Sequence, residues 1–169
     1  TNASGSGSSF RDDVAFEIRH AWTLPEADVP DGERRFGSSG VLVHDDVIAI
    51  ATDRGPDGTL LPGRVRLYDR QRPAAQPSSI LMAPGRSWPD GFGFALSGFE
   101  HRILVGAPDD SETNWGAGRV WLYLKTEDGW MVEDSFSDPS AETDAAFGHA
   151  IAIQKDLIVI GAPRCDKAD

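Results

Sequence analysis

Short apolar runs separated by polar turns recur along the whole chain and predict β-strands rather than helices. The runs are rich in Val, Ile, Leu and aromatic residues, which favour strands, and no stretch shows the spacing of an amphipathic helix. A first group of four expected strands comprises residues 41–43, 47–51, 64–69 and 79–82. A second group comprises residues 94–97, 103–105, 119–124 and 130–136, and a third group comprises residues 150–153 and 157–160.

The connections between these runs predict the order in which the strands pair. Only two residues separate the first two strands of each group, at 45–46, 100–101 and 155–156, which predicts tight hairpins. A loop is expected at residues 52–63, which contain three Gly and two Pro. The strand after this loop, RVRLYD, alternates Val65 and Leu67 with Arg and Tyr, the period of a half-buried strand.

The three groups form a sequence repeat. Each begins with a Phe-Gly pair, and the pairs are Phe36-Gly37, Phe92-Gly93 and Phe147-Gly148, so they recur at a nearly constant interval. The triplets Gly106-Ala107-Pro108 and Gly161-Ala162-Pro163 end the second strand of their groups and recur at the same interval. Regularly spaced units of four short strands are typical of the blades of a β-propeller, and the period here is about 55 residues.

The residue types of the repeat fit that architecture. The Phe supplies a large apolar anchor between neighbouring blades, and the Gly after it permits a close approach of two backbones. The Pro of the triplet has no N–H to donate, so it ends its strand. We therefore predict an all-β segment of a propeller.

Phe-Gly, then Gly-Ala-Pro, then Gly118 followed by Arg-Val-Trp-Leu-Tyr resembles the FG-GAP repeat of integrin α-subunit propellers and of bacterial and protist surface proteins. The second unit matches best, whereas the first has Ile50-Ala51-Thr52 in place of Gly-Ala-Pro. The resemblance implies a propeller that is extracellular or at the cell surface and acts in protein contact or adhesion.

The resemblance to the FG-GAP repeat raises the question of whether this chain binds calcium. Integrin-type repeats hold calcium in an Asp-rich loop between their first two strands, where this chain has tight turns without room for the six to eight oxygens required. We therefore expect no cofactor of that type. Weaker metal candidates are Asp53, Asp57, Asp109 and Asp110, whose alternative interpretation is that they lie in solvated loops.

The repeat divides the chain into parts that do not complete a propeller. Residues 1–13 form a polar lead-in, 14–35 match the third and fourth strands of a blade, 36–91 and 92–146 are full units, and 147–169 supply two strands. Two whole blades flanked by two half blades amount to about three, whereas closed propellers have four to eight. The missing blades are expected beyond Asp169 in the same polypeptide, or from a neighbouring chain that completes the half blades by strand pairing.

Composition narrows the class of partner. The net charge of −11 argues against nucleic acid and against an anionic membrane surface, because both attract basic proteins. No apolar run approaches the roughly 20 residues that span a bilayer. The expected partner is therefore protein, either the rest of the propeller or another chain.

Catalytic motifs are lacking, so the candidate residues concern recognition. The chain has no Gly-x-Ser-x-Gly, phosphate loop or His-Glu-x-x-His. Trp115, with Asn114 and Glu112 in a polar loop, is a candidate interface anchor, and its alternative is packing between neighbouring loops. Asn2 fits the N-glycosylation pattern, a triplet that also occurs by chance. Cys165, the single cysteine, is expected either to pair with a cysteine outside the chain or to be a buried thiol.

These observations favour a non-enzymatic extracellular or cell-surface propeller segment that mediates protein contact or adhesion. Two alternatives remain open at this point. The chain could be a structural subunit of an extracellular filament or large assembly, or a scaffold part of a larger hydrolase or lyase.

Overall fold

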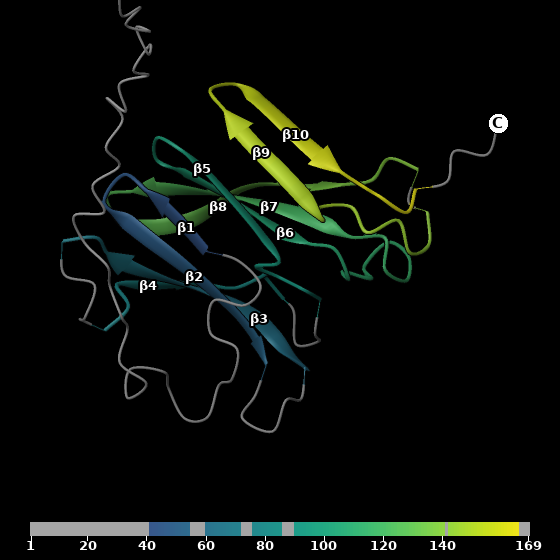
Figure 1. The fold of residues 1–169 in the computed structure, drawn as a ribbon, viewed down its shortest axis with the longest axis horizontal. Helices are drawn as coiled ribbons and strands as arrows, with labels where there is room; N and C mark the ends of the chain where they lie inside the picture. The colour runs from purple at the N-terminus through teal and green to yellow at the C-terminus, as the bar shows by residue number, and fades with distance from the viewer. Residues whose placement is uncertain (1–40, 55–59, 72–75, 86–89, 141, 166–169) are drawn as a thin grey trace, which may run out of the picture.

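The fold was obtained as a computed structural model, which describes residues 41–54, 60–71, 76–85, 90–140 and 142–165 (Figure 1). Within these ranges the chain forms antiparallel β-sheets and no helix, which confirms the all-β prediction. The partial blade expected in residues 14–35 lies outside the described residues.

The strands form three layers, two of four strands and one of two, in which each strand pairs with its neighbours in the sequence. Sheet 1 consists of β1 (Val41–His44), β2 (Val47–Arg54), β3 (Leu60–Asp69) and β4 (Ser79–Leu81). Sheet 2 consists of β5 (Ala95–Phe99), β6 (Arg102–Ala107), β7 (Arg119–Thr126) and β8 (Gly129–Ser137). The C-terminal hairpin consists of β9 (Ala150–Gln154) and β10 (Leu157–Gly161).

The tight turns between the first two strands share one backbone conformation. Asp45, Glu100 and Lys155 have φ of 48°, 50° and 55°, the left-handed region that non-glycine residues seldom adopt. These residues lie one repeat apart, so the same unusual conformation recurs at the same place in each layer.

The ladder between β2 and β3 extends further than the sequence predicts. The expected loop at residues 52–63 is shorter, because β2 continues to Arg54 and β3 begins at Leu60. Arg54 pairs with Leu60 across an irregularity that follows Thr52, and this irregularity absorbs the change of register. Turn-forming residues therefore do not end the strands where their composition suggested.

Sheet 2 lies between sheet 1 and the hairpin, as Figure 1 shows. Its side chains alternate between two apolar clusters, because neighbouring residues of a strand point to opposite faces. One cluster packs sheet 2 against sheet 1 through Val65, Leu67, Ile103, Val105 and Trp121, among others. The other packs sheet 2 against the hairpin through Leu104, Val120, Leu122 and Ile153, with Ile151, Ile158 and Ile160 beside them.

Both faces of β3 are buried, which corrects the interpretation of its alternating sequence. Val65 and Leu67 belong to the cluster shared with sheet 2, yet Arg66 and Tyr68 on the opposite face are each only 1% exposed. Of the Arg and Tyr positions that alternate with them, only Arg64 is exposed. The alternation of polar and apolar residues in β3 thus does not report which of its side chains are exposed to water.

The layers approach each other most closely at their first strands. β1 contacts β5, and β5 in turn contacts β9, whereas the fourth strands β4 and β8 make few contacts with each other. Gly93 and Gly148 precede the first strands of their layers and both have φ of 92°, and an added Cβ at either would crowd the second and third strands of the preceding layer. The sheets therefore fan out from a line of close backbone contacts.

Backbone hydrogen bonds repeat along with the layers. Four bonds at the strand ends of sheet 2 have counterparts one repeat later at the hairpin, with N···O distances of 2.9–3.2 Å and 3.1–3.3 Å respectively. In sheet 2 the bonds run from Gly93 N to Gly106 O, from Phe94 N to Gly91 O, from Asp109 N to Asp90 O and from Asp110 N to Ala107 O. Their counterparts at the hairpin, in the same order, run from Gly148 N to Gly161 O, from His149 N to Ala146 O, from Arg164 N to Ala145 O and from Cys165 N to Ala162 O. The sequence repeat is therefore also a repeat of structure.

Candidate functional site

The loop between β6 and β7, residues 108–118, presents the recognition residues and is tied together by its own hydrogen bonds. Pro108 follows the last residue of β6, and the Asp110 carboxylate accepts a hydrogen bond from Glu112 N at 3.0 Å. Gly118 N donates to Asp110 O at 2.9 Å, and Gly116 N donates to Ser111 Oγ at 3.0 Å. The loop backbone is thereby fixed before any partner arrives.

A neighbouring connection holds the same loop from outside. The carbonyl oxygens of Trp115, Gly116 and Ala117 accept hydrogen bonds from the backbone N–H groups of Asp144, Ala146 and Phe147, at 2.7, 3.0 and 2.9 Å. These donors belong to the segment between β8 and β9, which leads into the C-terminal hairpin. The loop is therefore braced against the next repeat.

Trp115 stands out of this braced loop into solvent. Its side chain is 79% exposed, so the indole does not pack between neighbouring loops. Asn114 and Glu112 beside it are also exposed. The structure thus brings the three predicted recognition residues together on one rigid, protruding loop.

One arginine, Arg119, contacts two carboxylates of this loop. The guanidinium of Arg119 lies 2.6 Å from Glu112 Oε2 and 3.7 Å from the buried carboxylate of Asp110, and it covers the ring of Trp121 at 5.4 Å. Arg119 thereby holds the Glu112 side chain against the start of β7. Asp109 is exposed on the same loop.

Asp109 and Asp110, the two metal candidates whose side chains the structure describes, lie in different surroundings. Asp110 is buried and serves the loop hydrogen bonds, whereas Asp109 faces solvent. In the described ranges no group of three or more His, Cys, Asp and Glu side chains could hold a metal ion. Asp57, the side chain of Asp53 and the glycosylation candidate Asn2 lie outside what the structure describes.

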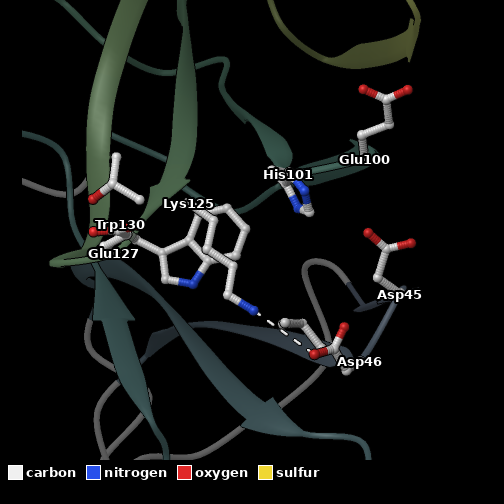
Figure 2. A pocket seen from close by; sticks show the side chains of 9 residues that line it. Asp45, Asp46, Glu100, His101, Lys125, Glu127 and Trp130 are labelled. Atoms are coloured by element: carbon white, nitrogen blue, oxygen red, sulfur yellow. Dashed lines mark ion pairs between the residues drawn. The ribbon is translucent and has the colours of Figure 1, made fainter.

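A groove of about 380 Å³ opens between the turns of sheets 1 and 2, at the opposite end of the strands from the Trp115 loop. Figure 2 shows Lys125 reaching toward Asp46, with Trp130 beside it; the Lys125 Nζ to Asp46 Oδ2 distance is 3.8 Å. Asp45, Asp46, Glu100, His101 and Glu127 form much of the rim. Trp130 begins an expected strand, and the sequence did not indicate that it also lines this groove.

The groove is braced by a repeated backbone bond. Arg70 N donates to Asp46 O in sheet 1, and Lys125 N donates to His101 O in sheet 2, both at 2.7 Å. The two donors lie one repeat apart, as do the two acceptors, so each third strand is tied to the turn of its own layer. The residues that line this groove are scattered in the sequence, so only the repeat could have indicated that they lie together.

Cys165 lies just after the hairpin and is half-buried. Its thiol donates to Glu142 Oε2 at 3.3 Å and lies 3.9 Å from Ser140 Oγ. The hydrogen bond to Glu142 raises the pKa of the Cys165 thiol, because this carboxylate stabilises the protonated form. A raised pKa disfavours the thiolate that disulfide exchange needs.

Asp138, beside this thiol, is held in the charged form. Its Oδ1 accepts hydrogen bonds from both the hydroxyl and the backbone N–H of Ser140, at 2.7 and 2.8 Å. These bonds lower the pKa of the Asp138 carboxyl, with the hydroxyl making the larger contribution. The arrangement caps a turn.

Comparison with known proteins adds no family assignment. No protein-family model matches the sequence, and no curated protein matches it. Nor does the described part of the chain contain a helix with the length and apolarity to cross a bilayer.

Proposed function

We propose that the chain is a non-enzymatic segment of a β-propeller with FG-GAP-like blades, and that it contacts other proteins through the Trp115 loop. The structural repeat supports the propeller architecture, as does the closer approach of the layers at their first strands. Blades arranged around a central axis converge at their inner strands in this way. The FG-GAP resemblance supports an extracellular or cell-surface location.

The observation that carries the contact function is the 79% exposure of Trp115 on a loop fixed by hydrogen bonds. Tryptophan is enriched among the few residues that dominate binding energy at protein interfaces. A loop already held in its binding conformation loses little conformational entropy when it binds. The exposed indole and the hydrogen-bonded loop backbone together therefore favour a role for Trp115 in binding another protein rather than in packing within this chain.

The surroundings of Trp115 define the chemistry of the partner. Asp109 is exposed on the same loop as Trp115, and the whole chain carries a net charge of −11. The complementary surface is an apolar pocket for the indole with a basic rim, because opposite charges favour the correct orientation and accelerate encounter. A cell-surface protein or matrix component of that kind is the proposed partner.

The test selects a displayed peptide library against the immobilised chain and measures each enriched peptide on wild type and on Trp115→Ala. We expect the peptides to contain Lys or Arg next to an apolar segment, and to lose at least about 30-fold in affinity on Trp115→Ala. The matched control is Met131→Ala, which removes an exposed apolar side chain from β8 instead.

Two outcomes would contradict the proposal. One is that the enriched peptides bind Trp115→Ala as tightly as wild type. The other is that Met131→Ala weakens binding as much as Trp115→Ala does, because the loop would then have no special role.

A further inference from the structure

The groove between the turns of sheets 1 and 2, which we call the Trp130 groove, has an indole in its wall. Trp130 is partly buried and packs against the core cluster between the two sheets, to which Val47, another residue of the groove, belongs. Trp130 is also the direct cross-strand partner of Lys125 in the β7–β8 ladder, so the two side chains leave the sheet on the same face. An indole held in this way is ready to contact a cation without first having to be ordered.

Lys125 shows that the Trp130 groove already accommodates a cation. Its side chain extends from beside the indole toward Asp46 of the neighbouring sheet, where Nζ lies 3.8 Å from Oδ2 (Figure 2). The two side chains are 42% and 64% exposed, and exposed ion pairs add little stability. A cation from another molecule therefore displaces the Lys125 ammonium from Asp46 at little cost.

The charges that line the Trp130 groove favour a cationic occupant. Four carboxylates come from the β1–β2, β5–β6 and β7–β8 turns, namely Asp45, Asp46, Glu100 and Glu127. Lys125 and His101 are the basic side chains among the lining residues, and Arg70, outside the groove, donates to the backbone oxygen of Asp45 at 3.2 Å. Negative charge therefore exceeds positive charge around the indole.

A second groove, of about 510 Å³, lies at the next boundary between layers and differs in both respects. Leu122 of β7 and Ile158 of β10 are among the residues that line it, and none of these residues is a tryptophan. Its charges nearly balance, with three carboxylates and two cations, namely Glu100, Glu133, Asp156, Arg102 and Lys155. Arg102 already binds the Glu133 carboxylate through two contacts, at 2.6 and 2.8 Å. Of the two grooves, the Trp130 groove is therefore the one that fits an added cation.

We propose that the Trp130 groove binds an arginine side chain of a partner protein, whose guanidinium displaces the Lys125 ammonium and stacks on the Trp130 indole. A guanidinium fits better than an ammonium, because it is planar, stacks on aromatic rings and donates two parallel hydrogen bonds to one carboxylate. Asp46, which Lys125 releases, is the expected acceptor.

The groove volume of about 380 Å³ leaves room for residues that flank the arginine, as a site for a protein segment requires. The Trp130 groove lies at the opposite end of the strands from the Trp115 loop. This inference therefore does not rest on the proposed contact function of that loop.

The first experiment titrates the full chain with the peptide acetyl-Ala-Ala-Arg-Ala-Ala-amide and follows the indole N–H signals by NMR. We expect the Trp130 signal, identified by its loss in Trp130→Leu, to shift on titration. The same peptide with citrulline in place of arginine keeps the shape but not the charge, and is expected to bind about 10-fold more weakly. The peptide with lysine in that place is also expected to bind more weakly than the arginine peptide.

Lys125→Ala gives the sharpest test, because it is expected to strengthen binding. It removes the cation that competes for Asp46, so the arginine peptide is expected to bind about 3-fold more tightly. A groove that bound an anion through Lys125 would respond in the opposite direction.

Two conservative variants of exposed carboxylates test the electrostatic part. Asp46→Asn and Glu127→Gln are each expected to weaken binding of the arginine peptide by about 5-fold. The matched control is Asp128→Asn, which removes the same charge next to Glu127 from a side chain that is exposed but does not line the groove. Asp128→Asn is expected to leave the affinity near that of wild type, and a wild-type amide spectrum shows that each variant is folded.

Several results would overturn the proposal. They are a Trp130 signal that does not move at millimolar peptide, a citrulline peptide that binds as tightly as the arginine peptide, and weaker binding by Lys125→Ala than by wild type. Equal losses for Asp128→Asn and Asp46→Asn would do the same, because the peptide would then respond to net charge alone.

Trp115→Ala separates this inference from the proposed function. It is expected to leave binding of the arginine peptide unchanged, since Trp115 lies at the other end of the strands. Loss of binding in this variant would assign the peptide to the Trp115 loop and would also overturn the proposal. The library peptides that test the Trp115 loop are measured separately, so either idea can fail while the other stands.

Discussion

The two interfaces between neighbouring layers use residues one repeat apart, but they are covered to different extents. Between sheets 1 and 2, four strands face four, and Leu67 is 0% exposed. Between sheet 2 and the hairpin, two strands face four, and the equivalent Leu122 is 7% exposed. Likewise Leu81 of β4 is buried, whereas its equivalent Phe136 of β8 is only half-buried. Equivalent positions therefore differ in burial because their neighbouring layer differs.

The same contrast appears in the loops that follow the second strands. Asp110 and Cys165 occupy equivalent positions and donate the same backbone hydrogen bond, to Ala107 O and Ala162 O, both at 3.2 Å. Asp110 is buried under its loop, and Cys165 is half-buried. Equivalent positions of the repeat thus make the same backbone hydrogen bond, while the side chain and its degree of burial differ from one layer to the next.

The largest expected effect on stability comes from adding a Cβ at glycines where the backbones of neighbouring layers touch. A Cβ at Gly63 would collide with the carbonyl oxygen of Phe92, and one at Gly118 would collide with that of Phe147. We expect Gly63→Ala and Gly118→Ala each to cost about 3 kcal/mol or more, because the obstacle is backbone and cannot rotate away.

Hydrogen exchange distinguishes the two glycine variants. Gly63→Ala is expected to speed exchange throughout sheets 1 and 2, whereas Gly118→Ala is expected to free the hairpin strands β9 and β10 first. Equal exchange patterns for the two variants would show that the interfaces are equivalent after all. Gly129→Ala is the control for a glycine in open space, since nothing lies within 4 Å of its added Cβ, although its φ of 118° adds backbone strain of its own.

A medium effect is expected from truncating the equivalent leucines. Leu67→Ala leaves a closed cavity and is expected to cost about 4 kcal/mol, whereas Leu122→Ala borders the second groove and is expected to cost about 2 kcal/mol. Urea unfolding at low protein concentration measures both values. A Leu122→Ala cost equal to that of Leu67→Ala would mean that the second interface is covered as well as the first.

The smallest expected effect concerns the ion pair in the second groove. Arg102 Nε and the guanidinium NH₂ group lie 2.6 and 2.8 Å from the Glu133 carboxylate, and the hydrogen bond lowers the pKa of Glu133 below its ordinary 4.5. A lowered pKa in the folded state stabilises the protein above pH 4.5, and this contribution is lost as the pH falls through the lower value.

Glu133→Gln is therefore expected to lower the melting temperature slightly near neutral pH, with the difference vanishing in acid. Thermal unfolding of both proteins from neutral pH down to about pH 3 measures this difference. A difference that stays constant across this range would show that the pair acts by packing rather than by charge.

Much of the fold followed from local sequence. The two-residue turns at 45–46, 100–101 and 155–156 predicted the hairpins, because so short a connection between apolar runs permits only adjacent antiparallel pairing. The spacing of the Phe-Gly pairs predicted the layers, and Pro108 predicted the end of β6. Of the candidate site, the loop and its tryptophan were predicted, whereas the choice between exposure and packing was not.

The sequence misled where burial depends on distant residues. Arg66 and Tyr68 alternate with apolar residues in β3, a pattern typical of a half-buried strand, but both are buried. The grooves at the layer edges could not be predicted either, because Lys125, Trp130 and Asp46 come together only when two sheets stack.

By itself, the sequence determined the strands, their turns and the period of the repeat, because each of these depends on backbone preferences within a few residues. Only the tertiary structure decided which faces are covered and that Trp115 stands in solvent. The reason is physical: a side chain is buried by whatever layer lies against it, and that layer comes from another part of the chain.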